Sequence, residues 1–402
     1  MSQAMFILWS DALPLVEDCR KLLQESCIIQ ADIEYEWSDA LISENMRRLY
    51  QQPIQLDKNL DFGREKMSGK NLHIFYVSTH IGDNIFHRSA AGEIEFVNSN
   101  ILSLKSKFRE LVYPLTGSPY SVHCASSSEE LKLQSALIFG LTEHKRLEKG
   151  ELILDKFKKA DLCGSGGWNS LHDAFQFISY LTSWCVMRGW ESLPDYVSGD
   201  DLDTLVENRK LFFAALGLKQ PNNHDFLRNG YLEIKNSDAF IKLDVHWIGD
   251  GYFDTKWQYN LLANKIPTNG FFIPDKINAL MTHLYSEYVL RPSPRPEKFE
   301  TLARLIKEID HNNIIDQEIL INQNAVIALL NDFMSQNNYT LSIPVVKRHT
   351  MANKAKKILK KTAKRPFGQR SAFTAAVIAI IKWFLPEFIQ EKIRELKLNK
   401  QS

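Results

Sequence analysis

The sequence lacks the cysteine pattern of a cross-linked or zinc-binding protein. Its five cysteines are spread along 402 residues, and no two of them form a C-x-x-C pair. An odd number of widely spread cysteines without a C-x-x-C pair argues against a disulfide framework and a zinc finger. The cysteines therefore indicate a reducing compartment.

An excess of charge of one sign is also missing. Lys and Arg number 49, Asp and Glu number 48, and the net charge is +1. This balance excludes a body that is basic or acidic throughout, so a charged patch must be local. There is no uncharged apolar run of about eighteen residues, which a membrane span requires, and residues 1–9 lack the basic segment of a secretory signal. We expect a cytoplasmic protein.

The length and composition allow several domains. A chain of 402 residues with 44% hydrophobic and 24% charged residues can form two or three cores. We expect an α/β and α+β multidomain fold. The expected parts are an α/β domain of unassigned role at 1–145, a linker at 146–167, a second α/β domain at 168–260, a helical domain at 261–340 and a basic, amphipathic tail at 341–402.

The first expected domain combines short apolar strands with helices. Residues 6–9 and 72–77 are apolar enough to form buried strands, and residues 15–24 and 127–139 have helical spacing. Ser127 with Glu130 resembles a capping box, and Gly140 is expected to end that helix. The charge-dense segment at 144–161 is compatible with a linker helix, and residues 163–167 form a glycine-rich joint.

The second expected domain alternates strands and helices. Ser170 is expected to cap a helix, residues 184–187 to form a strand, and residues 207–216 to form a helix that ends at Gly217. Residues 231–235 and 239–247 read as a hairpin. Further helices are expected at 275–290, 298–310 and 317–336.

Carboxylates stand on two of these strands. Asp201 and Asp203 are one residue apart at the start of an apolar run, so both side chains should point to one face of the strand. Asp244 alternates with apolar residues on the second strand of the hairpin. If the two strands are neighbours, three carboxylates converge. Because unpaired anions that close repel each other, such a cluster usually marks a cation site.

The order of strand, glycine loop, G-x-D-x-D strand, helix and hairpin resembles the nucleotidyltransferase superfamily, which has a DNA-polymerase-β-like fold. The resemblance covers residues 168–260, with 199–206 similar to the family's DxD strand and 243–247 to its third-carboxylate strand. It implies a mixed sheet with flanking helices. It also implies catalytic and metal-binding roles for Asp201, Asp203 and Asp244, with two Mg²⁺ ions and a nucleotide donor. Phosphoryl transfer suits such a site, because it depends mainly on charge neutralisation and positioning.

The loop before the DxD strand departs from the family pattern. The family has glycine-serine there, whereas this chain has Gly189 followed by Trp190, with Ser192 two residues later. The variant resembles a subgroup from bacterial surface-polysaccharide gene clusters. We expect phosphate contacts from Gly189 and Ser192, and further nucleotide contacts from Lys242 and His246 on the face of Asp244.

Simpler interpretations stay open for these residues. An Asp-x-Asp beside glycine is common in turns, since Asp bonds to its own backbone there. Lys242 and His246 also fit a solvent-facing strand surface, and Asp250 with Asp254 fits an ordinary loop.

The C-terminal tail differs in composition from the rest. Residues 347–370 contain ten Lys or Arg residues and no acid, and residues 372–385 are mostly apolar. A peripheral membrane contact, a nucleic-acid contact and a solvated helix with a docked helix all fit this pattern, and the first is favoured over nucleic acid. The residues expected to contact a membrane or polyanion are Lys356, Lys357, Lys360, Lys361 and Trp383.

Together these features predict a magnesium-dependent enzyme. It would transfer a nucleotidyl or phospho-polyol group from a nucleotide donor to a hydroxyl of a sugar or lipid-linked glycan, in the cytoplasm or at the inner face of the cytoplasmic membrane. One alternative is a catalytically silent module that binds a glycan or a partner, which Trp190 supports. The other is a nucleotidyltransferase that modifies nucleic acid and grips it with the basic tail.

Overall fold

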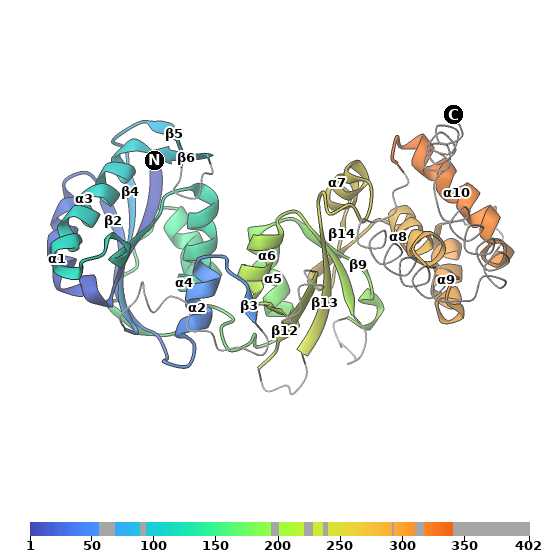
Figure 1. The fold of residues 1–402 in the computed structure, drawn as a ribbon, viewed down its shortest axis with the longest axis horizontal. Helices are drawn as coiled ribbons and strands as arrows, with labels where there is room; N and C mark the ends of the chain where they lie inside the picture. Colours follow the sequence, from blue (N-terminus) through green and yellow to red (C-terminus); the bar gives the residue numbers. More distant parts are fainter. Residues whose placement is uncertain are drawn as a thin grey trace, which may run out of the picture. The chain divides into compact units, whose positions relative to one another are not determined.

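A computed structural model describes residues 1–55, 69–88, 94–193, 201–220, 228–235, 240–291, 293–309 and 317–340 (Figure 1). These residues belong to one compact unit, Met1–Leu341. The described part is a mixed α/β structure with two main sheets, which confirms the expected fold class at that level. The tail expected at 341–402 lies outside the described residues.

The first sheet is built around two long apolar strands. The order is β7-β1-β4-β2-β8, with β8 parallel to β2 and the other neighbours antiparallel. Its strands are β1 (Ser2–Trp9), β2 (Ile28–Glu36), β4 (Asn71–Thr79), β7 (Val122–Ala125) and β8 (Phe157–Lys159). The central strands β1 and β4 are buried on both faces, because helices cover the sheet on two sides. Strand β8 falls within the segment that the sequence indicated as a linker.

Four helices accompany this sheet: α1 (Val16–Gln24), α2 (Ile42–Leu49), α3 (Ser99–Thr116) and α4 (Ser128–Glu148). Ser127 caps α4 by accepting a hydrogen bond from the Glu130 amide, as expected. Gly140 breaks the helical geometry with φ of 80°, but the chain resumes the helix beyond it up to Glu148. The helical segment that begins at Ser128 therefore ends at Gly140, as expected, and a second helical segment follows it. Glycine permits the kink because it adopts positive φ without steric cost.

The second sheet contains the strands that carry the predicted carboxylates. Its order is β3-β11-β12-β13-β10-β9. Its strands are β3 (Ile54–Gln55), β9 (Trp184–Arg188), β10 (Leu202–Val206), β11 (Lys219–Gln220), β12 (Asn229–Glu233) and β13 (Phe240–Trp247). Strand β10 is parallel to β13 and antiparallel to β9, while β12 and β13 are antiparallel as the hairpin pattern predicts.

Helices pack on both faces of the second sheet. Leu202, Val206 and Val245 face one core together with α5 (Leu171–Leu181) and α6 (Arg209–Leu216). Leu205 faces the other core with α7 (Thr255–Ala263) and α8 (Lys276–Leu284). Strand β10, between β9 and β13, therefore sends alternate side chains into two separate cores.

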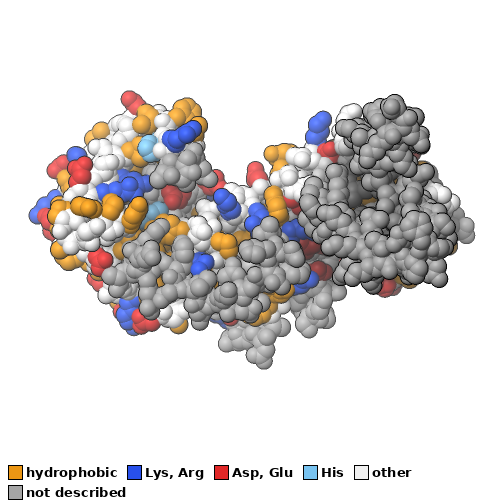
Figure 2. Space-filling model, viewed as in Figure 1, with side chains coloured by type: hydrophobic (Ala, Val, Ile, Leu, Met, Phe, Trp, Pro, Cys, Tyr) orange, Lys and Arg blue, Asp and Glu red, His pale blue; other side chains and the backbone are white. Residues whose placement is uncertain are grey.

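Short elements connect these layers and extend the helical region. They are η1 (Ser10–Leu15), β5 (Asn84–Arg88), β6 (Ile94–Asn98), η2 (Pro119–Ser121), η3 (Trp190–Ser192), β14 (Ile266–Thr268), β15 (Phe271–Ile273), the π-helix η5 (Tyr285–Val289), η6 (Pro296–Lys298), α9 (Phe299–Ile309), η7 (Gln317–Ile321) and α10 (Gln323–Gln336). Within the described part, no helix has both the length and the apolar character needed to cross a membrane. Lys, Arg, Asp and Glu side chains are interspersed on the face shown in Figure 2, which agrees with the balanced charge of the chain.

A buried arginine joins α2 to the second sheet's helices. Arg48 is fully buried and donates hydrogen bonds to the carbonyls of Ala214 at 2.9 Å and Ala215 at 2.6 Å, and to Ser165 Oγ at 2.9 Å. These carbonyls belong to the last turn of α6, which Gly217 ends in the left-handed conformation. The guanidinium thus takes the place of water at a helix C-terminus.

We expect Arg48→Met to lower the free energy of unfolding by at least about 2 kcal/mol, because it leaves buried carbonyls without donors. Urea unfolding followed by circular dichroism measures the change. The neighbouring variant Arg47→Met removes a more exposed donor and should cost less than about 1 kcal/mol. Equal losses in the two variants would contradict this role for Arg48.

His283 on α8 is a buried base. Its Nδ1 lies 2.8 Å from the carbonyl of Ala279, and its ring contacts Trp190 edge-on at 5.3 Å. Burial, together with the positive charge of Arg188, lowers the pKa of His283 from 6.5 to about 3. Between pH 6.5 and about 3, His283 is therefore mostly neutral in the folded protein and mostly protonated in the unfolded chain.

The stability of the protein should fall as the pH decreases from 6.5 towards 3, because only the unfolded chain gains this proton. The loss from His283 alone is about 1.4 kcal/mol per pH unit in that window. Urea unfolding at pH 7, 6 and 5 should show a shallower pH dependence for His283→Gln than for the original chain. His172→Gln, which changes an exposed histidine, should leave the slope unaltered; a His283→Gln slope equal to the original would refute the assignment.

Candidate functional site

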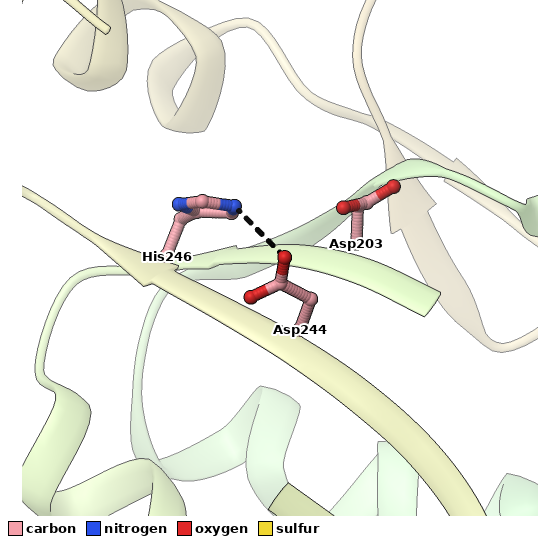
Figure 3. A group of neighbouring side chains, drawn as sticks. All are labelled: Asp203, Asp244 and His246. Atoms are coloured by element: carbon pink, nitrogen blue, oxygen red, sulfur yellow. Dashed lines mark ion pairs between the residues drawn. The ribbon is translucent and has the colours of Figure 1, made fainter. Parts of the chain in front are cut away.

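A row of charged residues crosses three strands of the second sheet. Asp203 on β10 pairs in register with Asp244 on the parallel strand β13 and with Arg188 on the antiparallel strand β9. Side chains of paired residues lie on the same face of a sheet. Figure 3 shows the carboxylates of Asp203 and Asp244 on that face, with His246 two residues farther along β13. The two strands that carry the carboxylates, β10 and β13, are thus neighbours, as predicted.

A β-bulge turns Arg188 towards this face. The register of β9 against β10 shifts between Asp203 and Thr204, so that Thr204 pairs with Val186 while Asp203 pairs with Arg188. Strict alternation would place Arg188 on the face opposite to Met187. The extra residue of the bulge instead places it beside Asp203, and re-aiming a side chain in this way is a common effect of bulges.

Arg188 forms a two-pronged ion pair with Asp203. Its Nε lies 3.0 Å from Oδ2 and its Nη2 lies 2.9 Å from Oδ1 of the carboxylate. Nη2 also donates to the Tyr252 hydroxyl at 2.9 Å. Burial alone lowers the pKa of Arg188, but Asp203 and Tyr252 raise it on balance, so the guanidinium stays charged. Arg188 directly precedes Gly189 in the sequence, where no pattern indicated a role for it.

His246 is fully buried between two carboxylates. Its Nδ1 lies 2.8 Å from Asp250 Oδ2, and its Nε2 lies 3.6 Å from Asp244 Oδ2. Burial lowers the pKa of His246, but Asp244 and Asp250 raise it on balance. Burial likewise raises the pKa of Asp244, whereas His246, Arg228 and Arg188 outweigh that effect and lower it to about 2. The carboxylates of Asp244 and Asp250 therefore favour a positive charge at or beside His246.

Three of these side chains can provide ligands to one cation. One ligand atom each from Asp203, Asp244 and His246 lies within 4.8 Å of the others. Two carboxylate oxygens and one imidazole nitrogen could bind a single divalent cation after side-chain shifts of a few tenths of an ångström, since metal–ligand distances of about 2.0–2.2 Å place two ligands at most about 4.4 Å apart. Within the described part of the chain, this is the group of His, Cys, Asp and Glu residues that meets that spacing.

Asp201 and Lys242 occupy the next position along the same face. Lys242 Nζ lies 3.2 Å from Asp201 Oδ2, and both side chains are partly exposed. Asp201 thus lies on the predicted face, but its carboxylate is paired with a lysine and is not part of the three-residue group. Lys242 is placed as expected beside the carboxylates, whereas His246, expected as a nucleotide contact or a solvent-facing residue, lies in the interior.

The loop after β9 is packed closely against the DxD strand. Gly189 has φ of +83°, and a Cβ there would come within 2.8 Å of the Asp201 carbonyl oxygen, so only glycine fits. Trp190 begins η3 and contacts His283. Ser192 ends η3, and its hydroxyl lies outside the described side chains, as do residues 194–200. The Trp190 side chain thus packs against α8 through His283.

Asp250 and Tyr252 belong to the site although the sequence indicated a loop. Asp250 Oδ1 accepts hydrogen bonds from the Tyr252 amide at 2.9 Å and from Gln258 Nε2 at 2.7 Å. The Tyr252 ring lies 3.7 Å from the ring of His246. Asp254, by contrast, caps α7. The spacing of four residues between His246 and Asp250 was the available signal, but in a turn it does not reveal a contact.

Two hollows among the described residues lie away from this charged row. One of about 670 Å³ lies beyond the far ends of β10 and β13, where Glu207, Arg209 and Trp247 line it. The other, of about 390 Å³, is lined by Trp190, Asn269 and Arg304 beside η3. The chemistry of the side chains therefore identifies the candidate site better than the size of a cavity. The tail residues Lys356, Lys357, Lys360, Lys361 and Trp383 lie outside the described residues.

Comparisons of the chain with protein-family models, curated proteins and solved structures found no match.

Removing one partner of the Arg188–Asp203 pair should destabilise the folded protein. Arg188→Ala leaves a carboxylate in a largely buried position without its partner, so we expect a loss of about 3 kcal/mol or more in the free energy of unfolding. Arg304→Ala removes an exposed arginine paired with Glu191 and Glu308, and should cost less than about 1 kcal/mol. Urea unfolding of both variants checks the contrast, and similar small losses would show that the buried pair contributes little.

Proposed function

We propose that this chain is a divalent-cation-dependent transferase that moves a nucleotidyl or phospho-polyol group from a nucleotide donor to a hydroxyl of a sugar or glycan. The observation that carries the proposal is the in-register placement of Asp203 and Asp244 on parallel strands, with His246 beside them. The sequence order around these strands, which resembles the nucleotidyltransferase superfamily, supplies the reaction class.

The charges around the site support phosphoryl chemistry. A cation held by Asp203 and Asp244 would neutralise phosphate charge and polarise a phosphoryl oxygen. Lys242, at the exposed end of the row, can hold a donor phosphate when Asp201 releases it. Arg228, with Nε 3.9 Å from Asp244 Oδ1, adds a second cationic group near the carboxylates.

We propose Mg²⁺ as the cofactor, and the ligands near the site determine how many ions can bind. The group of Asp203, Asp244 and His246 fits one cation. A second ion, which the family resemblance implies, would need Asp201 and the oxygens of the nucleotide itself. Nucleotide phosphates commonly complete a Mg²⁺ shell, because this ion keeps few protein ligands.

The acceptor and the location of the reaction rest on the sequence. The altered loop resembles that of polysaccharide-cluster proteins, which favours a sugar or lipid-linked glycan as the acceptor. The basic tail with Trp383 would bring the enzyme to anionic lipids at the inner face of the cytoplasmic membrane. We therefore propose both the class of acceptor and the membrane location.

Purified full-length protein should release a nucleotide product from a panel of nucleoside triphosphates and nucleotide-linked polyols in the presence of Mg²⁺ or Mn²⁺. We expect Asp203→Asn and Asp244→Asn each to reduce this turnover by at least about a hundredfold, because each removes a charge that holds the cation. Asp173→Asn, on the exposed face of α5, is the matched control and should retain full turnover. Turnover that survives both site variants would refute the proposal.

One observation favours a second candidate, a silent binding module. Arg188 contacts both oxygens of Asp203, so the carboxylate is already neutralised without a cation. A module of this kind would bind a nucleotide or glycan without turning it over. Equal binding by the original chain and by Asp203→Asn, with no product from either, would support the module over the enzyme.

A further inference from the structure

His246 has a nitrogen without a hydrogen-bond partner. The residue is fully buried, and its Nε2 is among the buried polar atoms of the described chain that make no hydrogen bond. The nearest carboxylate oxygen, Asp244 Oδ2, is 3.6 Å away, beyond hydrogen-bond distance. Leaving such an atom unsatisfied has an energetic cost in the folded protein. A ligand that binds Nε2 would remove this cost.

The other nitrogen of His246 is held by Asp250. Nδ1 lies 2.8 Å from Asp250 Oδ2, closer than the 3.3 Å to Arg228 Nη1. A carboxylate accepts but cannot donate, so the hydrogen of the neutral imidazole lies on Nδ1 and the lone pair lies on Nε2. A carboxylate behind a histidine is the arrangement that orients and strengthens histidine ligands in metal sites.

A second buried support holds Asp203. Arg188 uses one lone pair on each carboxylate oxygen and leaves the others available. Tyr252 accepts a hydrogen bond from Arg188, and its ring contacts the His246 ring at a tilt of 34°, so it connects the supports of two ligands. Arg188, Tyr252 and Asp250 are all buried, and therefore fix Asp203 and His246 without occupying the space between them.

The balance of charge leaves room for a cation. Asp203, Asp244 and Asp250 carry three negative charges, while Arg188 and Arg228 carry two positive charges. A metal ion that binds His246 displaces any proton from Nε2, so the imidazole is then neutral and the protein groups are one charge negative. The divalent cation changes the cluster to one charge positive. Neither value is extreme for a site that is partly open to solvent through Asp203 and Asp244.

We propose that Asp203, Asp244 and His246 together bind one divalent first-row transition-metal ion, such as Mn²⁺ or Zn²⁺, with His246 Nε2 as a direct ligand. Imidazole nitrogen suits these ions, whereas Mg²⁺ prefers oxygen ligands and water. The inference rests on the proposed function for the presence of a cation at this site, but it assigns His246 to the metal instead of the nucleotide.

The test uses full-length protein treated with chelator, then loaded with Mn²⁺ alone, without nucleotide. Pulsed electron paramagnetic resonance should show coupling of the bound Mn²⁺ to a ligand nitrogen. Titration should give a Mn²⁺ affinity that His246→Gln and Asp250→Asn each weaken by about tenfold to a hundredfold. His172→Gln, an exposed histidine on α5, should leave both the coupling and the affinity unchanged.

Absence of Mn²⁺ binding, or bound Mn²⁺ without nitrogen coupling in the original chain, would overturn the inference. This readout remains decisive if the His246→Gln variant does not fold. The two proposals also fail differently. Nitrogen-coupled Mn²⁺ without any transfer activity would refute the transferase alone, and Mg²⁺-dependent transfer without nitrogen coupling would refute the histidine ligand alone.

Discussion

The pairing of β10 between β9 and β13 is the constraint on which the second sheet and its site depend. Leu202 and Val206 enter one core and Leu205 enters the other, so both faces of this strand are committed to packing. A slip of one residue would move every side chain to the opposite face. The same hydrophobic contacts that hold the strand therefore fix Asp203 beside Asp244.

The charged side chains on this face can be largely buried because they are paired with one another. Arg188 reaches Asp203 only through the bulge in β9, and Tyr252 and Asp250 reach His246 from the turn that follows β13. Buried charges without partners would be expelled or neutralised. This arrangement joins two roles that are usually distinct. The pair of Arg188 and Asp203 can orient Asp203 as a metal ligand, and Arg188 can also neutralise this carboxylate when no metal is bound.

The first sheet contributes structure to the second. Strand β3 comes from the N-terminal part of the chain but pairs with β11 in the second sheet, and Arg48 completes the end of α6. Conversely, β8 lies in the segment expected as a linker and pairs with β2 in the first sheet. The first sheet therefore extends into the expected linker, and β3 is the strand that departs from the sequence order by joining the second sheet.

The sequence by itself determined the local elements and the face on which the carboxylates lie. Alternation along 241–247, the Ser127 and Ser170 caps and the glycine at 217 depend on neighbouring residues, so they could be predicted from short segments. Tertiary structure decided which partners meet: Arg188 with Asp203, Asp250 with His246, and Asp201 with Lys242. The first two pairings arise from a bulge and a turn, and the third from the pairing of strands distant in sequence. Such geometry results from packing across the whole sheet, which no short sequence pattern encodes.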